Sequence, residues 1–93
     1  MALPVFYSDH ARDTARQVYN FILSKFGEKA ARHFQVKLKK TIHSISEFPY
    51  AFKATDLYDS IRIALIAKQT SVVYEVKEEL IYLHYFWDNR QDQ

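Results

Sequence analysis

Ninety-three residues with seven Phe, seven Tyr and one Trp suffice for one domain with a hydrophobic core, and this aromatic content excludes a disordered chain. The absence of cysteine excludes disulfides and thiolate metal sites, and it fits a reducing compartment, so we expect a cytoplasmic protein. The formal charge of +2 is a weak indication of anionic partners. No apolar run approaches the ~20 residues of a membrane span, so we expect no membrane association.

The first half of the chain predicts a short strand and two helices. Leu3–Tyr7 is a β-type run in which Pro4 favours an edge position in a sheet. Ser8 is a plausible N-cap for an amphipathic helix, and Gly27, the only glycine, stands where a left-handed C-cap belongs. A second helical pattern follows at once and ends at Phe48–Pro49, because the residue before proline avoids the α region. The two helices should form an antiparallel hairpin.

The second half of the chain predicts strands. We expect residues 50–60 to form a loop that is packed through its aromatic side chains. After residue 60, apolar residues no longer recur at helical spacing but at every second position. Strand-like runs cover residues 61–66, 71–76 and 80–87. Neither connection contains glycine, so we expect loops of three or more residues. The prediction is a single α+β domain over residues 1–93 with the order β-α-α-β-β-β, in which a helical hairpin packs on one face of an antiparallel sheet.

Two arginines are placed near strand ends. Arg62 opens the first strand of the meander, and Arg90 follows the last strand. If they converge on the sheet, they form a surface that grips an anion. The alternatives are structural: Arg62 paired with Glu75 of the adjacent strand, and Arg90 as a frayed terminal charge.

A basic segment and the aromatic residues offer further candidate surfaces. Residues 29–40 hold five Lys/Arg and no acid, so this helix face is either solvated or a partner-binding surface. The candidate partner-binding residues are Lys29, Arg32, Lys37, Lys40 and Trp87. Trp87 is expected either to cap the core or to lie exposed against a partner. The aromatic residues expected in the core are Phe6, Tyr19, Phe26, Phe34, Tyr74 and Phe86.

The order of these features resembles the RelE/ParE superfamily of toxins from bacterial type II toxin–antitoxin systems. The resemblance runs through nearly the whole chain and is most specific at Phe86–Asp92, where Asp-Asn-Arg-Gln-Asp follows an apolar strand. Ile61–Arg62 and Val73–Val76 also match. The resemblance implies a protein that inhibits growth of its own cell when free, as in plasmid stabilisation, and that is neutralised by a co-expressed antitoxin.

Two activities are known in that superfamily. RelE-like members cut mRNA in the ribosomal A site without a metal, which requires cations at the phosphate and groups that move protons. For such an endoribonuclease the candidate catalytic residues are Arg62, Arg90, Lys68, His84 and Tyr85. Because neighbours in a strand point to opposite faces, only one of His84 and Tyr85 should face the site.

ParE-like members poison DNA gyrase and need only a helical hairpin and a sheet with a few exposed charges. We therefore favour gyrase poisoning slightly over RNA cleavage. A non-toxic basic interaction module and a decayed toxin are further alternatives.

The expected partner is a cognate antitoxin. Such a segment is acidic and amphipathic, folds on binding, and covers the hairpin and the sheet to form a hetero-oligomer. We expect no cofactor and no metal, because His33 and His43 do not have the i, i+4 spacing of a helical metal pair.

Overall fold

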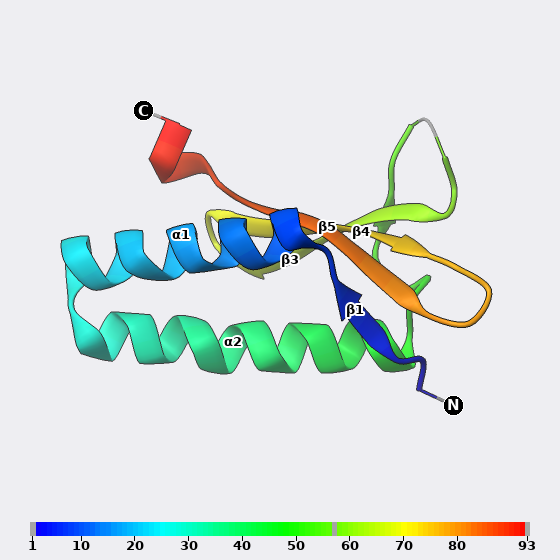
Figure 1. Ribbon diagram of the computed structural model, residues 1–93, viewed down its shortest axis with the longest axis horizontal. Helices are drawn as coiled ribbons and strands as arrows, with labels where there is room; N and C mark the ends of the chain where they lie inside the picture. Colours follow the sequence, from blue (N-terminus) through cyan, green and yellow to red (C-terminus); the bar gives the residue numbers. More distant parts are fainter. Residues whose placement is uncertain (1, 57, 93) are drawn as a thin grey trace.

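The computed structural model describes residues 2–56 and 58–92, which form two layers, a helical hairpin and a mixed sheet (Figure 1). The elements are β1 (Val5–Tyr7), α1 (Asp9–Phe26), α2 (Glu28–Glu47), β2 (Lys53–Ala54), β3 (Ile61–Ala67), β4 (Thr70–Val76), β5 (Ile81–Asp88) and a 3-10 turn (Asn89–Asp92). The predicted α+β order is confirmed, with the short β2 added inside the predicted loop. None of the helices in the described ranges is long and apolar enough to cross a membrane.

The helix boundaries lie where the local signals predict them. The Ser8 hydroxyl accepts a hydrogen bond from the Ala11 N–H at 2.9 Å, as an N-cap does. Gly27 stands between α1 and α2 with φ +91° and ψ 177°, a backbone region that is essentially restricted to glycine. The second helix ends at Glu47, directly before Phe48–Pro49. Local sequence therefore determines the hairpin.

The sheet has the strand order β1-β5-β4-β3-β2, and β3, β4 and β5 form the predicted antiparallel meander. The expectation of a wholly antiparallel sheet is wrong, because β1 pairs in parallel with β5, from Val5↔Ile81 to Tyr7↔Leu83. Both pairings use the same alternation of side chains, so the sequence pattern cannot distinguish them. The hairpin carries the chain from β1, at one edge of the sheet, to β2 and β3 at the other edge (Figure 1).

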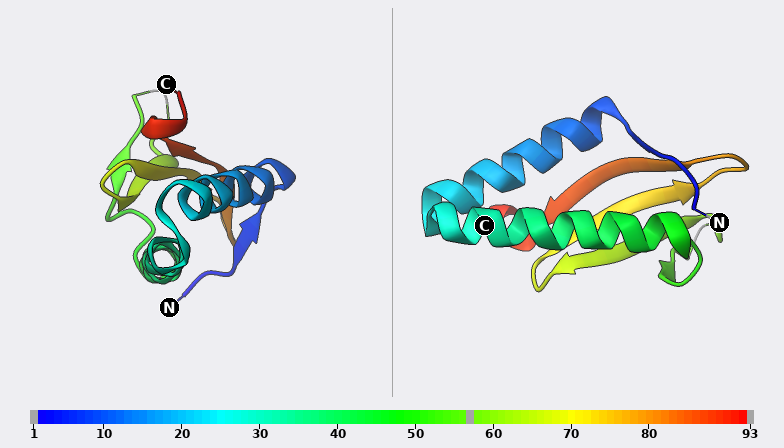
Figure 2. Two further views of the ribbon diagram at one scale, coloured as in Figure 1. Left: turned by 90° about the vertical axis from the view of Figure 1, so that its left-hand side faces the viewer. Right: turned by 90° about the horizontal axis from the view of Figure 1, so that it is seen from below.

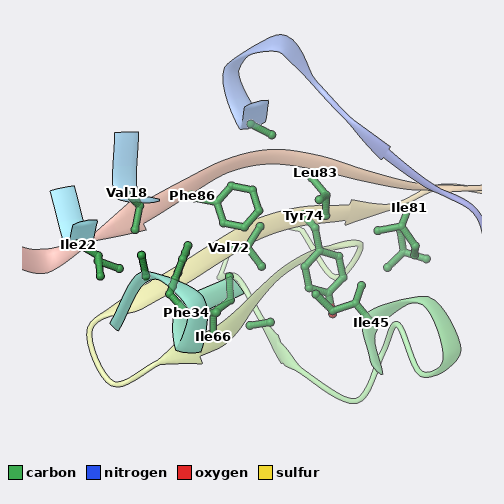
Figure 3. Packing of buried hydrophobic residues seen from close by; sticks show 14 residues of the cluster. Val18, Ile22, Phe34, Ile45, Ile66, Val72, Tyr74, Ile81, Leu83 and Phe86 are labelled. Atoms are coloured by element: carbon green, nitrogen blue, oxygen red, sulfur yellow. The ribbon is translucent and has the colours of Figure 1, made fainter. Parts of the chain in front are cut away.

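The core lies between the hairpin and one face of the sheet (Figures 2 and 3). Its buried apolar residues include Val18, Ile22, Phe34, Ile45, Ile66, Val72, Tyr74, Ile81, Leu83 and Phe86. The core assignment is wrong for Phe6 and Phe26, whose exposed fractions are 51% and 53%. Both lie at the margin of the layers, where helical or strand period alone does not decide burial.

The connections between strands differ from expectation in one case. Lys68 and Gln69 alone join β3 to β4, so the prediction of a longer loop is wrong there. A register irregularity lies between Leu65 and Ala67, just before this turn. The connection from β4 to β5 spans residues 77–80, as expected.

Candidate functional site

Arg62 is a structural residue of β3 that binds the loop preceding this strand. Its guanidinium donates hydrogen bonds to the carbonyl oxygens of Tyr50 at 3.1 Å and Phe52 at 2.8 Å, and Nη2 lies 2.9 Å from Asp59 Oδ1. Its side chain is only 12% exposed. The predicted packing of this loop through its aromatic side chains is confirmed for Phe52, which packs against the core, and is wrong for Tyr50 and Tyr58, which are 54% and 61% exposed. The ionic partner of Arg62 is Asp59 rather than the expected Glu75.

Arg90 is also held by neighbours. Its Nη2 donates to Asp88 Oδ2 at 2.7 Å, its Nε donates to Oδ1 at 3.0 Å, and the Thr70 hydroxyl donates to Oδ2 at 2.6 Å. Burial raises the pKa of Asp88, but the hydrogen bonds from Arg90 and Thr70 outweigh it, so the pKa is lowered. The guanidinium also lies 5.7 Å and 5.3 Å from the rings of Phe21 and Phe26. Arg90 therefore joins the end of β5 to the tip of α1.

The two arginines do not converge. Arg62 pairs with Tyr74 near one end of β4, whereas Asp88, two residues before Arg90, pairs with Thr70 at the other end. In an antiparallel meander of three strands, the start of the first and the end of the third lie at opposite ends. The expected joint anion grip of Arg62 and Arg90 is therefore wrong. Lys68, in the β3–β4 turn, is exposed at the Arg90 end.

A bulge in β5 changes the prediction for His84 and Tyr85. Val73 pairs with Tyr85 and Tyr74 with Leu83, so His84 is an extra residue in the ladder. Because Leu83 and Phe86 are both buried on the helix side, His84 and Tyr85 both lie on the opposite side, which we call the outer sheet face. The expectation that only one of this pair faces a common site is wrong, since strict alternation fails at a bulge.

The N-cap residue of α1 and one side chain of the helix hold this bulge in place. The Ser8 hydroxyl that caps α1 also donates to the carbonyl oxygen of His84 at 2.9 Å. The Phe86 N–H donates to the Thr14 hydroxyl at 2.9 Å. These two bonds satisfy backbone polar groups of β5 in the part of the strand that continues past β1 and has no neighbouring strand on that side.

His84 belongs to a polar cluster on the outer sheet face. Its Nε2 lies 3.0 Å from Glu75 Oε1, and its ring makes a T-shaped contact with the ring of Tyr82 at 4.8 Å. Lys77 Nζ lies 3.9 Å from the other carboxylate oxygen of Glu75. With a proton on Nε2, the carboxylate orients the imidazole and leaves the Nδ1 lone pair available as a base.

A hollow of about 530 Å³ joins this cluster to the start of α1. His10, His84 and Tyr85 all line it, and the ring centroids of His10 and Tyr85 are 5.7 Å apart. Sequence reasoning missed His10 because nothing in the local pattern links residue 10 to a strand 75 positions away. Among the side chains that the structure describes, no group of three His, Cys, Asp or Glu could hold a metal ion.

The rest of the outer sheet face is apolar and aromatic. Ile63 pairs through Val73 with Tyr85, and Leu65 pairs through Ser71 with Trp87. Four of these side chains are well exposed: Ile63 at 38%, Leu65 at 62%, Tyr85 at 36% and Trp87 at 45%. Three of them, Ile63, Tyr85 and Trp87, line a hollow of about 400 Å³. Of the two alternatives for Trp87, exposure is confirmed.

The positive charge of Lys and Arg on the outer sheet face is confined to its margin. Arg62 is the only Lys or Arg in β3, β4 and β5, and its pairing with the buried Tyr74 places it on the helix side. Lys53 of β2 pairs with Ile63 and is exposed at one edge, and Lys77 lies beside Glu75. The centre of this face thus offers apolar contact rather than an anion site.

The structure divides the predicted partner-binding residues between two surfaces. Trp87 lies on the outer sheet face, whereas the exposed basic residues of α2 lie on the helical layer that covers the other side of the sheet (Figure 2). The basic members are Lys29, Arg32, Lys37 and Lys40.

Comparison with known proteins supports the fold. No family model matches the chain, and no curated protein matches it. A chain of the chromosomal ParDE TA system from P. aeruginosa is 10% identical, with a TM-score of 0.77 and coverage of 94% of this chain and 96% of that one. The E. coli DinJ–YafQ toxin–antitoxin complex contains a chain that is 10% identical, with a TM-score of 0.67 and coverage of 98% and 97%. The YoeB dimer from Staphylococcus aureus is 14% identical, with a TM-score of 0.61 and coverage of 91% and 94%.

These comparisons agree with the fold that the resemblance to the RelE/ParE superfamily implied. The matches span nearly the full length of both chains, so the whole α+β domain is shared. The low identities mean that this likeness establishes the fold, and function has to be argued from the side chains.

Proposed function

We propose that this chain is the toxin of a type II toxin–antitoxin system and that it poisons DNA gyrase in the cytoplasm by binding the enzyme through its outer sheet face. The observation that carries the proposal is the composition of that face. Exposed apolar and aromatic side chains fill its centre, and the one arginine of the three long strands faces the other way. A protein target suits such a surface better than a phosphate chain does.

Trp87 and Tyr85 are the natural anchors of such an interface. Binding energy at protein interfaces is concentrated in Trp, Tyr and Arg side chains that become fully desolvated. Both rings are exposed beside Ile63 and Leu65, which would exclude water around them. The Trp87 indole N–H donates to Asn89 Oδ1 at 2.7 Å, so its polar atom is already satisfied when the ring is covered.

An antitoxin segment would neutralise the toxin by covering the same face. Apolar side chains of an amphipathic segment would replace the target on Ile63, Leu65 and Trp87. Acidic side chains would meet Lys53 and Lys77 at the margin. The product is a toxin–antitoxin hetero-oligomer in which the antitoxin folds on binding.

Induction of this chain alone in a bacterial host tests the proposal. We expect DNA synthesis to stop before protein synthesis, and purified gyrase to lose supercoiling activity when the protein is added. Normal growth with the full-length protein accumulating, together with unaffected gyrase, would instead indicate a non-toxic interaction module or a decayed toxin.

A ribosome-dependent endoribonuclease is the second candidate, and the polar cluster around His84 favours it. His84 Nδ1 would take the proton of an RNA 2′-hydroxyl, whose oxygen attacks the adjacent phosphorus. The bond from phosphorus to the 5′-oxygen then breaks, and that oxygen receives a proton from His10 or Tyr85. The products are a 2′,3′-cyclic phosphate and a free 5′-hydroxyl. Lys77, whose Nζ lies 3.9 Å from Glu75, supplies a positive charge to this cluster.

Substitution of the paired residues separates the two candidates. His84→Gln and Glu75→Gln would lower a cleavage rate by roughly 10²–10⁴-fold if His84 moves a proton. Gyrase poisoning through Trp87 and Leu65 would survive both changes. Mapping of mRNA ends after a rapid stop in protein synthesis would identify the endoribonuclease directly.

A further inference from the structure

The exposed side of α2 carries the positive charge of this protein. The helix contains five Lys/Arg and two Glu, whereas the rest of the chain contains eight Lys/Arg and nine Asp/Glu. Glu47, one of the two acids, lies 2.8 Å from His43 Nε2, so a neighbour on the same helix already contacts it. The formal charge is therefore +3 on α2 and −1 on the rest of the chain, so the net charge of +2 comes from this helix.

The basic residues of α2 form one continuous surface. Ala31, Phe34 and Ile45 are buried and define the side of the helix that faces the core. At about 100° per residue, Lys29 and Lys40 lie opposite that side, with Arg32 on one flank and Lys37 on the other. All four are exposed, and Lys39 is exposed beyond Arg32. We call these five residues the basic α2 face.

The basic α2 face is open and long. In the right-hand view of Figure 2, α2 runs along the near side of the molecule and no other described element lies in front of it. From Lys29 to Lys40 the helix advances about 16 Å, at roughly 1.5 Å per residue. This length spans several phosphates of a nucleic-acid strand.

The chemistry of this face does not fit a protein partner. Protein interfaces need a desolvated apolar or aromatic centre, and lysine is depleted from them. The large apolar side chain exposed here is Val36, at 52%, and no aromatic residue accompanies it within residues 29–40 except the buried Phe34. A row of cations without anchors fits a polyanion instead.

We propose that the basic α2 face binds the phosphate backbone of duplex DNA without sequence specificity. The major groove of B-DNA admits an α-helix, whereas that of duplex RNA is too deep and narrow for side chains to enter. Arg32 and Lys37, on opposite flanks of the helix, would each face the phosphates of one strand, and the long side chains of Lys29 and Lys40 between them would also reach phosphates. This inference is independent of the proposed function, because the outer sheet face lies on the other side of the sheet.

Fluorescence anisotropy with a short labelled DNA duplex tests the inference on the full-length protein over a range of salt concentrations. We expect log Kd to rise with log salt by about 0.9 for each phosphate contact. The variant Lys29→Gln/Arg32→Gln/Lys40→Gln should lower that slope by about 2.7, because three contacts are lost. Arg12→Gln/Lys53→Gln/Lys77→Gln removes the same charge from exposed positions elsewhere and should retain most of the slope.

Several results would overturn the inference. These are equal losses in both triple variants, duplex RNA bound as tightly as duplex DNA, polyglutamate bound in preference to DNA, or no binding by the parent protein at low salt. Thermal melting followed by circular dichroism shows whether each variant is folded. A smaller slope of log Kd against log salt in a folded variant then reflects the removed charge.

Discussion

His84 Nε2 and Glu75 Oε1 lie 3.0 Å apart across β5 and β4, although Glu75 is paired in register with Tyr82. The contact is possible because His84 is the extra residue of the β5 bulge and extends on the outer sheet face toward the neighbouring strand. The Ser8 hydroxyl donates to the carbonyl of the same residue, so the start of α1 fixes this geometry. One serine side chain therefore both caps α1 and binds the backbone of the candidate site.

The outer sheet face should lose its function when its anchors are removed. Trp87→Ala combined with Leu65→Ser should weaken inhibition of growth and of gyrase by roughly 30-fold or more, as expected for a hot spot worth about 2 kcal/mol. Because both side chains are exposed, the melting temperature should change little. Tyr58→Ser, which removes a 61% exposed aromatic ring from the loop before β3, is the matched control. Equal inhibition by all three proteins would contradict the assignment of this face.

The stability of the protein should depend on pH through the ionisation of Asp88. The pKa of Asp88 is lowered in the folded protein. Its contribution to the free energy of unfolding is therefore complete above the unfolded-state pKa of about 3.9, and it is lost as the pH falls through the folded-state pKa. Asp88→Asn leaves Arg90 without its ionic partner and should cost about 3 kcal/mol at neutral pH. Urea unfolding at pH 7 and pH 3 should show a smaller loss on acidification for the variant than for the parent protein.

Arg62 should act on stability rather than on activity. Arg62→Ala removes the donor to three loop carbonyls, those of Tyr50, Phe52 and Asp59, and should cost about 2 kcal/mol. Arg62→Lys should restore little because lysine lacks the fork of donors. Two measurements check this prediction: the melting temperature of each variant, and its inhibition of growth normalised to the amount of folded protein. A variant with unchanged stability and no toxicity would show instead that Arg62 contacts the target.

Gly27 should resist replacement by any other residue. Its φ of +91° and ψ of 177° are disfavoured for asparagine as well as alanine, although no atom lies within 4 Å of the position of an added Cβ. Gly27→Ala and Gly27→Asn should therefore each cost about 1–3 kcal/mol through backbone strain alone. Denaturant unfolding measures both. A much smaller cost for asparagine would mean that the hairpin turn relaxes into the left-handed helical region.

Local chemistry in the sequence was enough for the two helices and for every strand except the short β2. The Ser8 cap, the positive φ of Gly27 and the stop at Phe48–Pro49 each depend on residues within a few positions, and all three are observed. The change of period after residue 60 likewise predicted the meander. From these elements, the hairpin on one face of a sheet follows, because each helix has a single apolar stripe to bury.

The tertiary structure decided what the elements bring together. The parallel pairing of β1, the separation of Arg62 from Arg90, and the meeting of His10, His84 and Tyr85 all depend on strand direction and register between residues far apart in the chain. In a regular strand, successive side chains point to opposite faces of the sheet. The bulge at His84 interrupts this alternation, and hydrogen bonds from Ser8 and Thr14 hold the bulge in place. Local preferences fix helices and strands, whereas a candidate site is fixed by long-range hydrogen bonds that no short pattern encodes.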